Sequence, residues 1–177
     1  MYSFSDFGLL ESLQKTLKEN RLFKPTEIQI EAIPVMMGGQ SLVGVSETGS
    51  GKTLVYALPI LSKLKSLEDE GEPVKKEGTP RAVVVVPTRE LGEQVSKVFK
   101  TFTHGTRLRV RPALGGMTFE HSRRNAKGAF EILLTTPGRL VQMMQRKLID
   151  LTDVRILVFD EADQMMDQGF LPNSNLI

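Results

Sequence analysis

The chain has 177 residues, 40% apolar and 25% charged, which is typical of a single soluble domain with its own core. It contains no cysteine, which excludes disulfides, thiolate zinc sites and thiol nucleophiles. No export signal and no apolar stretch of bilayer-spanning length is present, so we expect a cytoplasmic protein with no membrane segment.

Two helices are expected first, at about 8–20 and 26–37, and strand-like runs then alternate with helix-like runs. The charged stretch 66–80 contains Gly and Pro and is predicted to be a surface loop. The alternation predicts an α/β fold, with a largely parallel sheet and helices on both of its faces. The expected strands are 41–45, 81–87, 108–114, 131–136 and 154–159, and the expected helices between them are 54–64, 90–102, 119–127 and 140–147.

The stretch "SETGSGKT" (46–53) follows an expected strand and opens an expected helix. A glycine-rich turn in that setting can point several N–H groups at a phosphate, and the helix N-terminus adds positive potential. Lys52 would then reach the terminal phosphates and Thr53 would ligate Mg²⁺. A flexible turn would explain one glycine but not the Lys-Thr pair. Ser46 departs from the pattern, because GxxxxGK[ST] has glycine there.

The run "RILVFDEAD" (155–163) is a strand that ends in adjacent carboxylates, at the sheet edge where α/β proteins bind ligands. Asp160 is expected to hold the Mg²⁺, and Glu161 to orient and deprotonate the attacking water. The alternative is a favourable acidic first turn of a helix. A phosphate loop together with this Asp-Glu pair predicts hydrolysis of a nucleotide, with Lys52 as the third catalytic residue.

Twelve Lys or Arg stand against four Asp or Glu between Lys97 and Arg155. Such a surplus suits an anionic partner, but it also suits a solvated surface whose charges cancel in three dimensions. His104 and His121 have no ligand-spaced partners and are expected at the surface. The methionine pairs 143–144 and 165–166 are interpreted as core residues.

Together these motifs resemble the first RecA-like domain of the DEAD-box RNA helicases, a P-loop NTPase fold. The resemblance covers essentially the whole chain and rests on the joint order of the motifs. Phe4 stands seventeen residues before the position that opens the adenine-recognition motif. In order, the motifs are "KPTEIQ" (24–29), "SETGSGKT" (46–53), "PTREL" (87–91), "GG" (115–116), "TPGR" (136–139) and "DEAD" (160–163).

The resemblance implies ATP as substrate, with Gln29 reading adenine and Asp163 taking part in coupling between domains. "KPTEIQ" alone would indicate only a helix start. Arg21 and Leu22 stand where the family has glycine and an aromatic, so an aliphatic shelf replaces the stacked ring unless Phe23 compensates. The implied nucleotide-binding residues are Phe4, Lys24, Thr26, Gln29, Ser46, Thr48, Gly49, Ser50, Gly51, Lys52 and Thr53.

The resemblance also implies that the RNA backbone is bound without regard to sequence, by arginines, hydroxyls and glycines of three motifs. Taken singly, each motif has a local reading as a turn or a helix start, and Arg89 is placed to pair with Glu93. The implied RNA-binding residues are Pro87, Thr88, Arg89, Gly115, Gly116, Thr136, Pro137, Gly138 and Arg139.

We expect residues 1–38 to form the adenine-recognition helices and 39–177 the ATP-binding core of one domain. In the family a Ser-Ala-Thr motif, whose strand lies inside the sheet, and a second RecA-like domain follow. The chain is therefore expected to be part of a longer helicase, with a gap in the sheet and slow ATP turnover alone. A DNA-acting motor of the same superfamily and an ATP-gated RNA clamp without efficient catalysis remain as alternatives.

Overall fold

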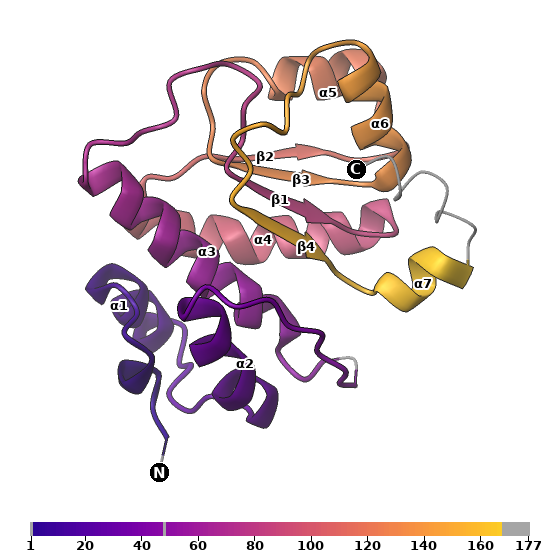
Figure 1. Cartoon of the computed structure of the whole chain (residues 1–177). Coiled ribbons are helices and arrows are strands. Elements are labelled where there is room, and N and C mark those ends of the chain that lie inside the picture. The colour runs from indigo at the N-terminus through magenta and orange to yellow at the C-terminus, as the bar shows by residue number, and fades with distance from the viewer. Residues whose placement is uncertain (1, 48, 168–177) are drawn as a thin grey trace. The chain divides into compact units, whose positions relative to one another are not determined.

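A computed structural model describes residues 2–47 and 49–167 (Figure 1). Contacts divide the chain into two units, each described separately below. The first comprises Met1–Gly71 and Val98–Arg107, and the second comprises Glu72–Lys97 and Leu108–Ile177. The predicted boundary between residues 38 and 39 stays a prediction. Among the described residues, no helix is both long and apolar enough to cross a membrane.

The first unit is helical, and its helices match those expected from the sequence. Phe4, Phe7, Leu13 and Leu17 are buried among them, and the ring of Tyr56 lies 6.3 Å from that of Phe99. Its elements are the 3-10 helix η1 (Phe4–Phe7) and the α-helices α1 (Glu11–Glu19), α2 (Glu27–Met37) and α3 (Lys52–Asp69). Because α3 continues to Asp69, the loop predicted at 66–80 begins four residues later than expected.

The strand expected at 41–45 is wrong, since these residues form no regular element. Val43 and Val45 are 95% and 91% exposed. The β-branched composition suited a strand, but strand formation needs a neighbouring backbone to pair with. No strand among the described residues pairs with this segment.

Helix α1 ends in a Schellman motif whose left-handed residue is not glycine. The N–H of Arg21 donates to the carbonyl of Lys18 (3.0 Å), and the N–H of Leu22 donates to that of Leu17 (2.9 Å). Arg21 has φ of 57°. This geometry is the usual place for glycine, and a side chain there costs about 1–2 kcal/mol.

Replacing Arg21 by Gly should therefore raise the free energy of unfolding by about 0.5–1 kcal/mol. This value is the strain relieved at the left-handed position minus the larger conformational entropy that glycine loses on folding. Urea denaturation would measure the change. Glu19→Gly is the matched control, because Glu19 lies in the last turn of α1 with ordinary helical geometry, and its loss should cost about 1 kcal/mol. A less stable R21G protein would contradict the strain at this position.

The second unit is built on a four-stranded parallel sheet, so the predicted α/β fold is confirmed. The strand order is β2-β3-β1-β4, and Val83 of β1 pairs with Leu133 of β3 and Leu157 of β4. The strands are β1 (Ala82–Val85), β2 (Val110–Ala113), β3 (Ile132–Thr135) and β4 (Ile156–Phe159). The remaining helices are α4 (Arg89–Thr106), which contributes residues to both units, α5 (Phe119–Asn125), α6 (Pro137–Gln145) and α7 (Ala162–Asp167).

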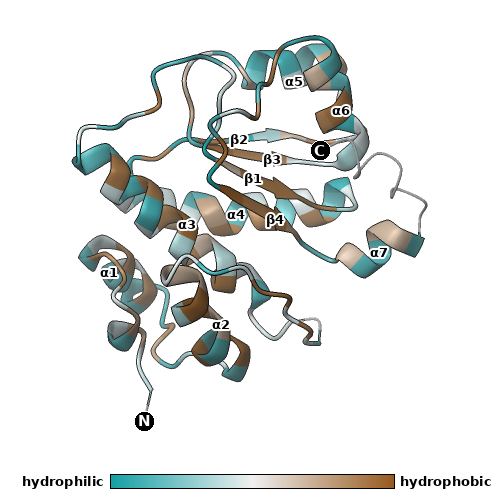
Figure 2. Ribbon diagram, in the orientation of Figure 1, coloured by the Kyte–Doolittle hydropathy of each residue, from teal (hydrophilic) through white to brown (hydrophobic). Residues whose placement is uncertain are grey.

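The central strands β1 and β3 are buried on both faces, as Figure 2 suggests by their apolar colouring. Helices α5 and α6 lie along one face, where Leu140 and Met143 join the core of the sheet (Figure 1). The outer strands differ. Strand β2 carries Pro112, which suits an edge, whereas β4 exposes Leu157 and Phe159 and has no described strand on its second side.

Candidate functional site

The phosphate-loop motif lies in the first unit, at the start of α3. Gly49 and Gly51 have φ of 83° and 91°, which is the left-handed region that glycine adopts readily. The ammonium of Lys52 donates to the carbonyl of Ser46 (2.6 Å), and the hydroxyls of Ser46 and Ser50 are 2.7 Å apart. The side chain of Ser46 thus bonds within the loop, which gives this departure from glycine a structural use.

The adenine-recognition motif is bonded to the phosphate loop within the same unit. Thr26 donates through its hydroxyl to the carbonyl of Ser50 (2.8 Å), and the amide of Gln29 donates to the carbonyl of Gly51 (3.1 Å). The Gln29 oxygen accepts from the N–H of Thr26 (3.0 Å) at the start of α2. Gln29 is 3% exposed, so both ends of its amide are engaged inside the chain.

The other residues predicted to bind nucleotide are less closely connected. Phe4 is buried, with its ring edge-on to Phe7 at 5.9 Å. Lys24 is exposed, Thr53 is half-buried one residue into α3, and Thr48 lies outside the described residues. Phe23 is among the exposed large side chains, so an aromatic ring is present one position after the aliphatic Leu22.

These loop atoms suit a bound Mg²⁺ and triphosphate by their chemistry. The first amides of a helix have no intrahelical acceptor, and in α3 these positions carry Lys52 and Thr53, a lysine ammonium and a threonine hydroxyl. Across residues 2–47 and 49–167, no three His, Asp or Glu side chains gather as a ready-made metal site. This is compatible with Mg²⁺, which takes one or two protein ligands and completes its shell with phosphates and water.

In the second unit, four motifs follow four adjacent parallel strands. "PTREL" follows β1, "GG" follows β2, "TPGR" follows β3 and "DEAD" follows β4. Parallel strands place their carboxyl ends along one edge, and the strand order makes the spatial order of the motifs GG, TPGR, PTREL and DEAD. The sheet edge expected from the sequence is therefore present, and motifs distant in sequence are neighbours along it.

The Gly115-Gly116 turn is bonded to the adjacent TPGR motif and to the PTREL motif beyond it. The N–H of Gly115 donates to the hydroxyl of Thr136 (2.9 Å), and a guanidinium N–H of Arg89 reaches the carbonyl of Gly116 at 3.4 Å. Arg89 also pairs with Glu93 at 2.8 Å, as its spacing predicted, and its side chain is half exposed. An exposed guanidinium with one carboxylate partner still has donors for another anion.

The local readings of these motifs are correct as well. Thr88 accepts from the N–H of Leu91 (3.2 Å) at the start of α4, and Pro137 is the first residue of α6, with Gly138 behind it. Pro87 is buried in the turn after β1. A threonine hydroxyl that accepts in this way keeps its own proton to donate. Structural and RNA-contacting roles are thus compatible for Thr88.

Arg139 differs from Arg89 because it is 9% exposed. Its guanidinium donates to the carbonyls of Met117 (2.6 Å) and Thr118 (3.2 Å), and to the hydroxyl of Ser122 (2.5 Å). Burial lowers its pKa, and the nearby charge of Arg146 adds to this. The three acceptors lie on the segment that follows the Gly-Gly turn.

The acidic motif places its first carboxylate inside the protein. Asp160 is 8% exposed, and its N–H donates to the carbonyl of Val85 (2.9 Å), which fixes it at the end of β1 and β4. Glu161 is half-buried and has φ of 51°. Helix α7 starts only at Ala162, so the helix-turn reading fits Asp163 and not the two preceding acids.

Other expectations for single residues have mixed outcomes. His104 and His121 are exposed, as expected. Met143 and Met165 belong to the core and Met144 packs against it. Met166 is exposed, so the core reading is wrong for this residue.

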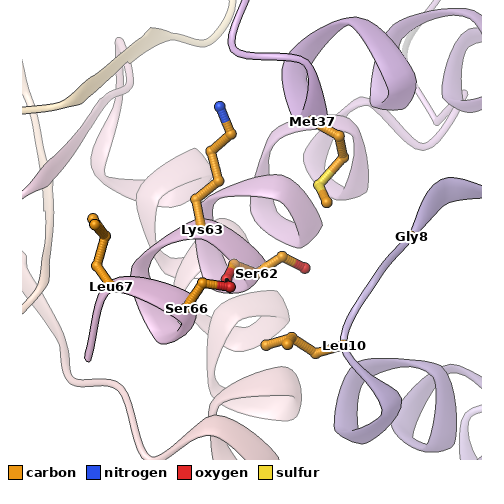
Figure 3. Close-up of a pocket in the computed structure, with 7 residues that line it drawn as sticks. All are labelled: Gly8, Leu10, Met37, Ser62, Lys63, Ser66 and Leu67. Carbon is orange, nitrogen blue, oxygen red and sulfur yellow. Dashed lines mark hydrogen bonds between the residues drawn. The ribbon is translucent and has the colours of Figure 1, made fainter. Parts of the chain in front are cut away.

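A hollow of about 270 Å³ lies among the helices of the first unit (Figure 3). It contains none of the residues predicted to act on ATP or RNA. The hydroxyl of Ser62 is buried there without a partner among the described residues. Gly8, Leu10, Met37, Ser62, Lys63, Ser66 and Leu67 line it.

Comparison with known proteins decides the family. The sequence model of the DEAD/DEAH box helicases matches residues 26–177. The chain belongs to the DEAD/DEAH box helicase family. It is 34% identical over 175 residues to the RNA helicase CrhR of Synechocystis sp., covering 99% of this chain and 34% of that protein.

Two eukaryotic relatives agree with this DEAD-box assignment. DEAD-box ATP-dependent RNA helicase 39 of Arabidopsis thaliana is 41% identical, over 96% of this chain and 27% of its own length. The probable ATP-dependent RNA helicase DDX4 of Pelophylax lessonae is 39% identical, over 95% of this chain and 23% of its own length. The chain thus spans about a quarter to a third of these relatives.

Sequence reasoning missed the acceptors of Arg139. Met117 and Thr118 contribute main-chain carbonyls, which no side-chain pattern reveals. One signal was available, because Thr118 precedes a helical run and caps α5 by accepting from the N–H of His121 (3.2 Å). That cap fixes where the segment turns, and hence where its carbonyls point.

Proposed function

We propose that this chain is the first RecA-like domain of an ATP-dependent DEAD-box RNA helicase, which binds ATP and the RNA backbone and contributes to ATP hydrolysis. The observation that carries the proposal is the sheet edge of the second unit, where four motifs follow four adjacent strands. The phosphate loop of the first unit, bonded to Gln29 and Thr26, supports the same activity.

The nucleotide is assigned to the phosphate loop. The amides at the start of α3 and the ammonium of Lys52 bind the phosphates, and Thr53 and Asp160 are the protein ligands of Mg²⁺. Bound Mg²⁺ neutralises charge that builds up on the β- and γ-phosphates. Gln29 holds the loop through its bond to Gly51, and it is also the residue proposed to read adenine. To do so, its amide has to break or share its present bonds to Thr26 and Gly51.

Hydrolysis is assigned to Glu161, which orients the attacking water and accepts its proton. Its left-handed backbone fixes the direction in which the carboxylate leaves the chain, and a strained residue of this kind is common at active sites. Asp163, the second residue of α7, is the residue proposed for coupling between this domain and the second RecA-like domain.

RNA is assigned to the edge formed by the Gly-Gly turn, the TPGR motif beside it and the PTREL motif beyond. Arg89 and the hydroxyls of Thr88 and Thr136 are the proposed contacts to phosphates, and Gly115, Gly116 and Gly138 would allow the RNA strand to approach the main chain of the protein. Pro137 and Pro87 shape the turns, and Arg139 belongs to the same cluster. Such contacts are independent of base sequence. A second RecA-like domain in the same longer protein is the proposed partner.

The test is the ATP turnover, with Mg²⁺, of the longer protein that carries the proposed second RecA-like domain, measured without nucleic acid, with single-stranded RNA and with DNA of the same sequence. We expect RNA to stimulate turnover and DNA to have little effect, and we expect GTP to be a poorer substrate than ATP. Equal stimulation by DNA would favour a DNA-acting motor of the same superfamily. Stimulation by neither polymer would contradict the proposed function.

A further inference from the structure

Arg139 is a buried cation, and burial and the charge of Arg146, with no carboxylate among the described residues, set the shift of its pKa. Two protons of one guanidinium nitrogen go to Thr118 and Ser122, and the other terminal nitrogen bonds Met117. Its three known acceptors are thus on residues 117–122. Because the residue as a whole is 9% exposed and both terminal nitrogens are bonded within the protein, little of it is left for a ligand outside.

The ring of Phe119 adds a second restraint on the same segment. The guanidinium carbon of Arg139 lies 5.7 Å from the ring centroid, and that of Arg146 lies 3.9 Å from it. Arg146 is exposed and follows α6, whereas Arg139 is inside. Two arginines of one helical segment therefore hold Phe119, the first residue of α5.

The segment that Arg139 holds leads directly to the proposed RNA edge. Gly115 and Gly116, just before Met117, are bonded to Thr136 and Arg89. A shift of the Met117 carbonyl would therefore move the glycine amides that approach the RNA. The two arginines of the cluster have opposite surroundings, since Arg89 is half exposed beside Glu93 and Arg139 is enclosed by carbonyls.

We propose that Arg139 is a positioning residue for RNA binding, which fixes the Gly115–Ser122 segment through Met117, Thr118 and Ser122, and does not itself contact a phosphate. This inference rests on the proposed function, because it concerns the same RNA edge. It assigns the phosphate contact to Arg89. It also predicts that RNA binding requires the several fixed N–H donors of the guanidinium at position 139, but only the positive charge of the side chain at position 89.

The experiment compares Arg→Lys with Arg→Gln at both positions. Binding of a fluorescein-labelled oligouridine by the protein is followed by anisotropy, with Mg²⁺ and a nonhydrolysable ATP analogue, between about 50 and 200 mM salt. A residue that contacts a phosphate contributes about 0.7 to the slope of log affinity against log salt for a single strand. A residue that acts through the protein contributes nothing to it.

At position 139, lysine and glutamine should weaken binding alike, by at least about tenfold, with an unchanged salt slope and an unchanged KM for ATP. At position 89, glutamine should lower the slope by about 0.7 and lysine should keep most of it. Arg155→Gln is the neutral control, since Arg155 is exposed just before β4 and far along the strand from the motif edge.

Hydrogen exchange of the RNA-free protein gives a second readout, which also covers a variant that folds poorly. R139K and the milder Ser122→Ala should speed amide exchange within residues 115–122 and leave the rest of the second unit protected. A loss of slope near 0.7 in R139Q that lysine restores would overturn the inference, as would unchanged exchange in R139K. Wild-type protein that binds no RNA would instead overturn the proposed function, and this inference with it.

Discussion

Replacing Glu161 by Gln is expected to lower RNA-stimulated ATP turnover by about 10²–10⁴-fold, the usual contribution of a general base. Glutamine keeps the size of the side chain and a hydrogen-bond acceptor, but it cannot take a proton at neutral pH. The KM for ATP should change little, because the phosphate loop and Lys52 remain. Steady-state kinetics at saturating RNA would measure both quantities.

Asp167→Asn is the matched control for this variant. Asp167 is an exposed carboxylate at the end of α7, six residues further on, and its loss should leave turnover unchanged. If E161Q retained the turnover of the parent protein, Glu161 would not be the base. The protein would then fit an ATP-gated RNA clamp, whose function needs binding of ATP and not its hydrolysis.

Gly78→Ala should lower the free energy of unfolding by about 2–4 kcal/mol. Gly78 has φ of 73°, and a methyl group there would overlap the main-chain carbonyl of Leu148. The carbonyl of Gly78 also accepts from the N–H of Asp150 (2.8 Å), so the two segments cannot separate without losing that bond. Urea denaturation, followed by circular dichroism, would measure the loss.

Gly128→Ala separates the cost of the left-handed backbone conformation from the cost of the steric overlap with Leu148. Gly128 has a similar φ of 76° in the same unit, but a methyl group there would meet nothing within 4 Å. Its replacement should cost only the left-handed conformation, about 1–2 kcal/mol. Equal losses for the two alanine variants would show that the close approach to Leu148 has no energetic effect.

The sequence predicted most of the second unit because its signals are local. The run "AVVV" has the apolar continuity of a buried parallel strand, and β1 is buried along its whole length. The segment 41–45 has a similar composition and yet forms no strand. Composition reports only that a residue suits a sheet, whereas pairing depends on which backbone lies alongside, and that information is not local.

The difference between local and non-local information also explains why the pairing of Arg89 was predicted from the sequence and the burial of Arg139 was not. The spacing of Arg89 and Glu93 on one helix predicted their pairing, because residues four apart on a helix are neighbours. The burial of Arg139 depends on carbonyls about twenty residues earlier, brought close by the pairing of β2 with β3. A charge surplus counted along the chain therefore includes an arginine that offers little charge to the surface.

The parallel register has a consequence for how such a domain tolerates change during evolution. Each motif directly follows the carboxyl end of its own strand. One residue inserted within a strand would therefore displace the motif by about 3.3 Å, and it would reverse which side chains of the strand point inward. Insertions or deletions in the loops at the opposite, amino-terminal edge of the sheet would leave the positions of the motifs relative to one another unchanged. Homologous chains should therefore differ in length at that edge and keep the strands themselves constant.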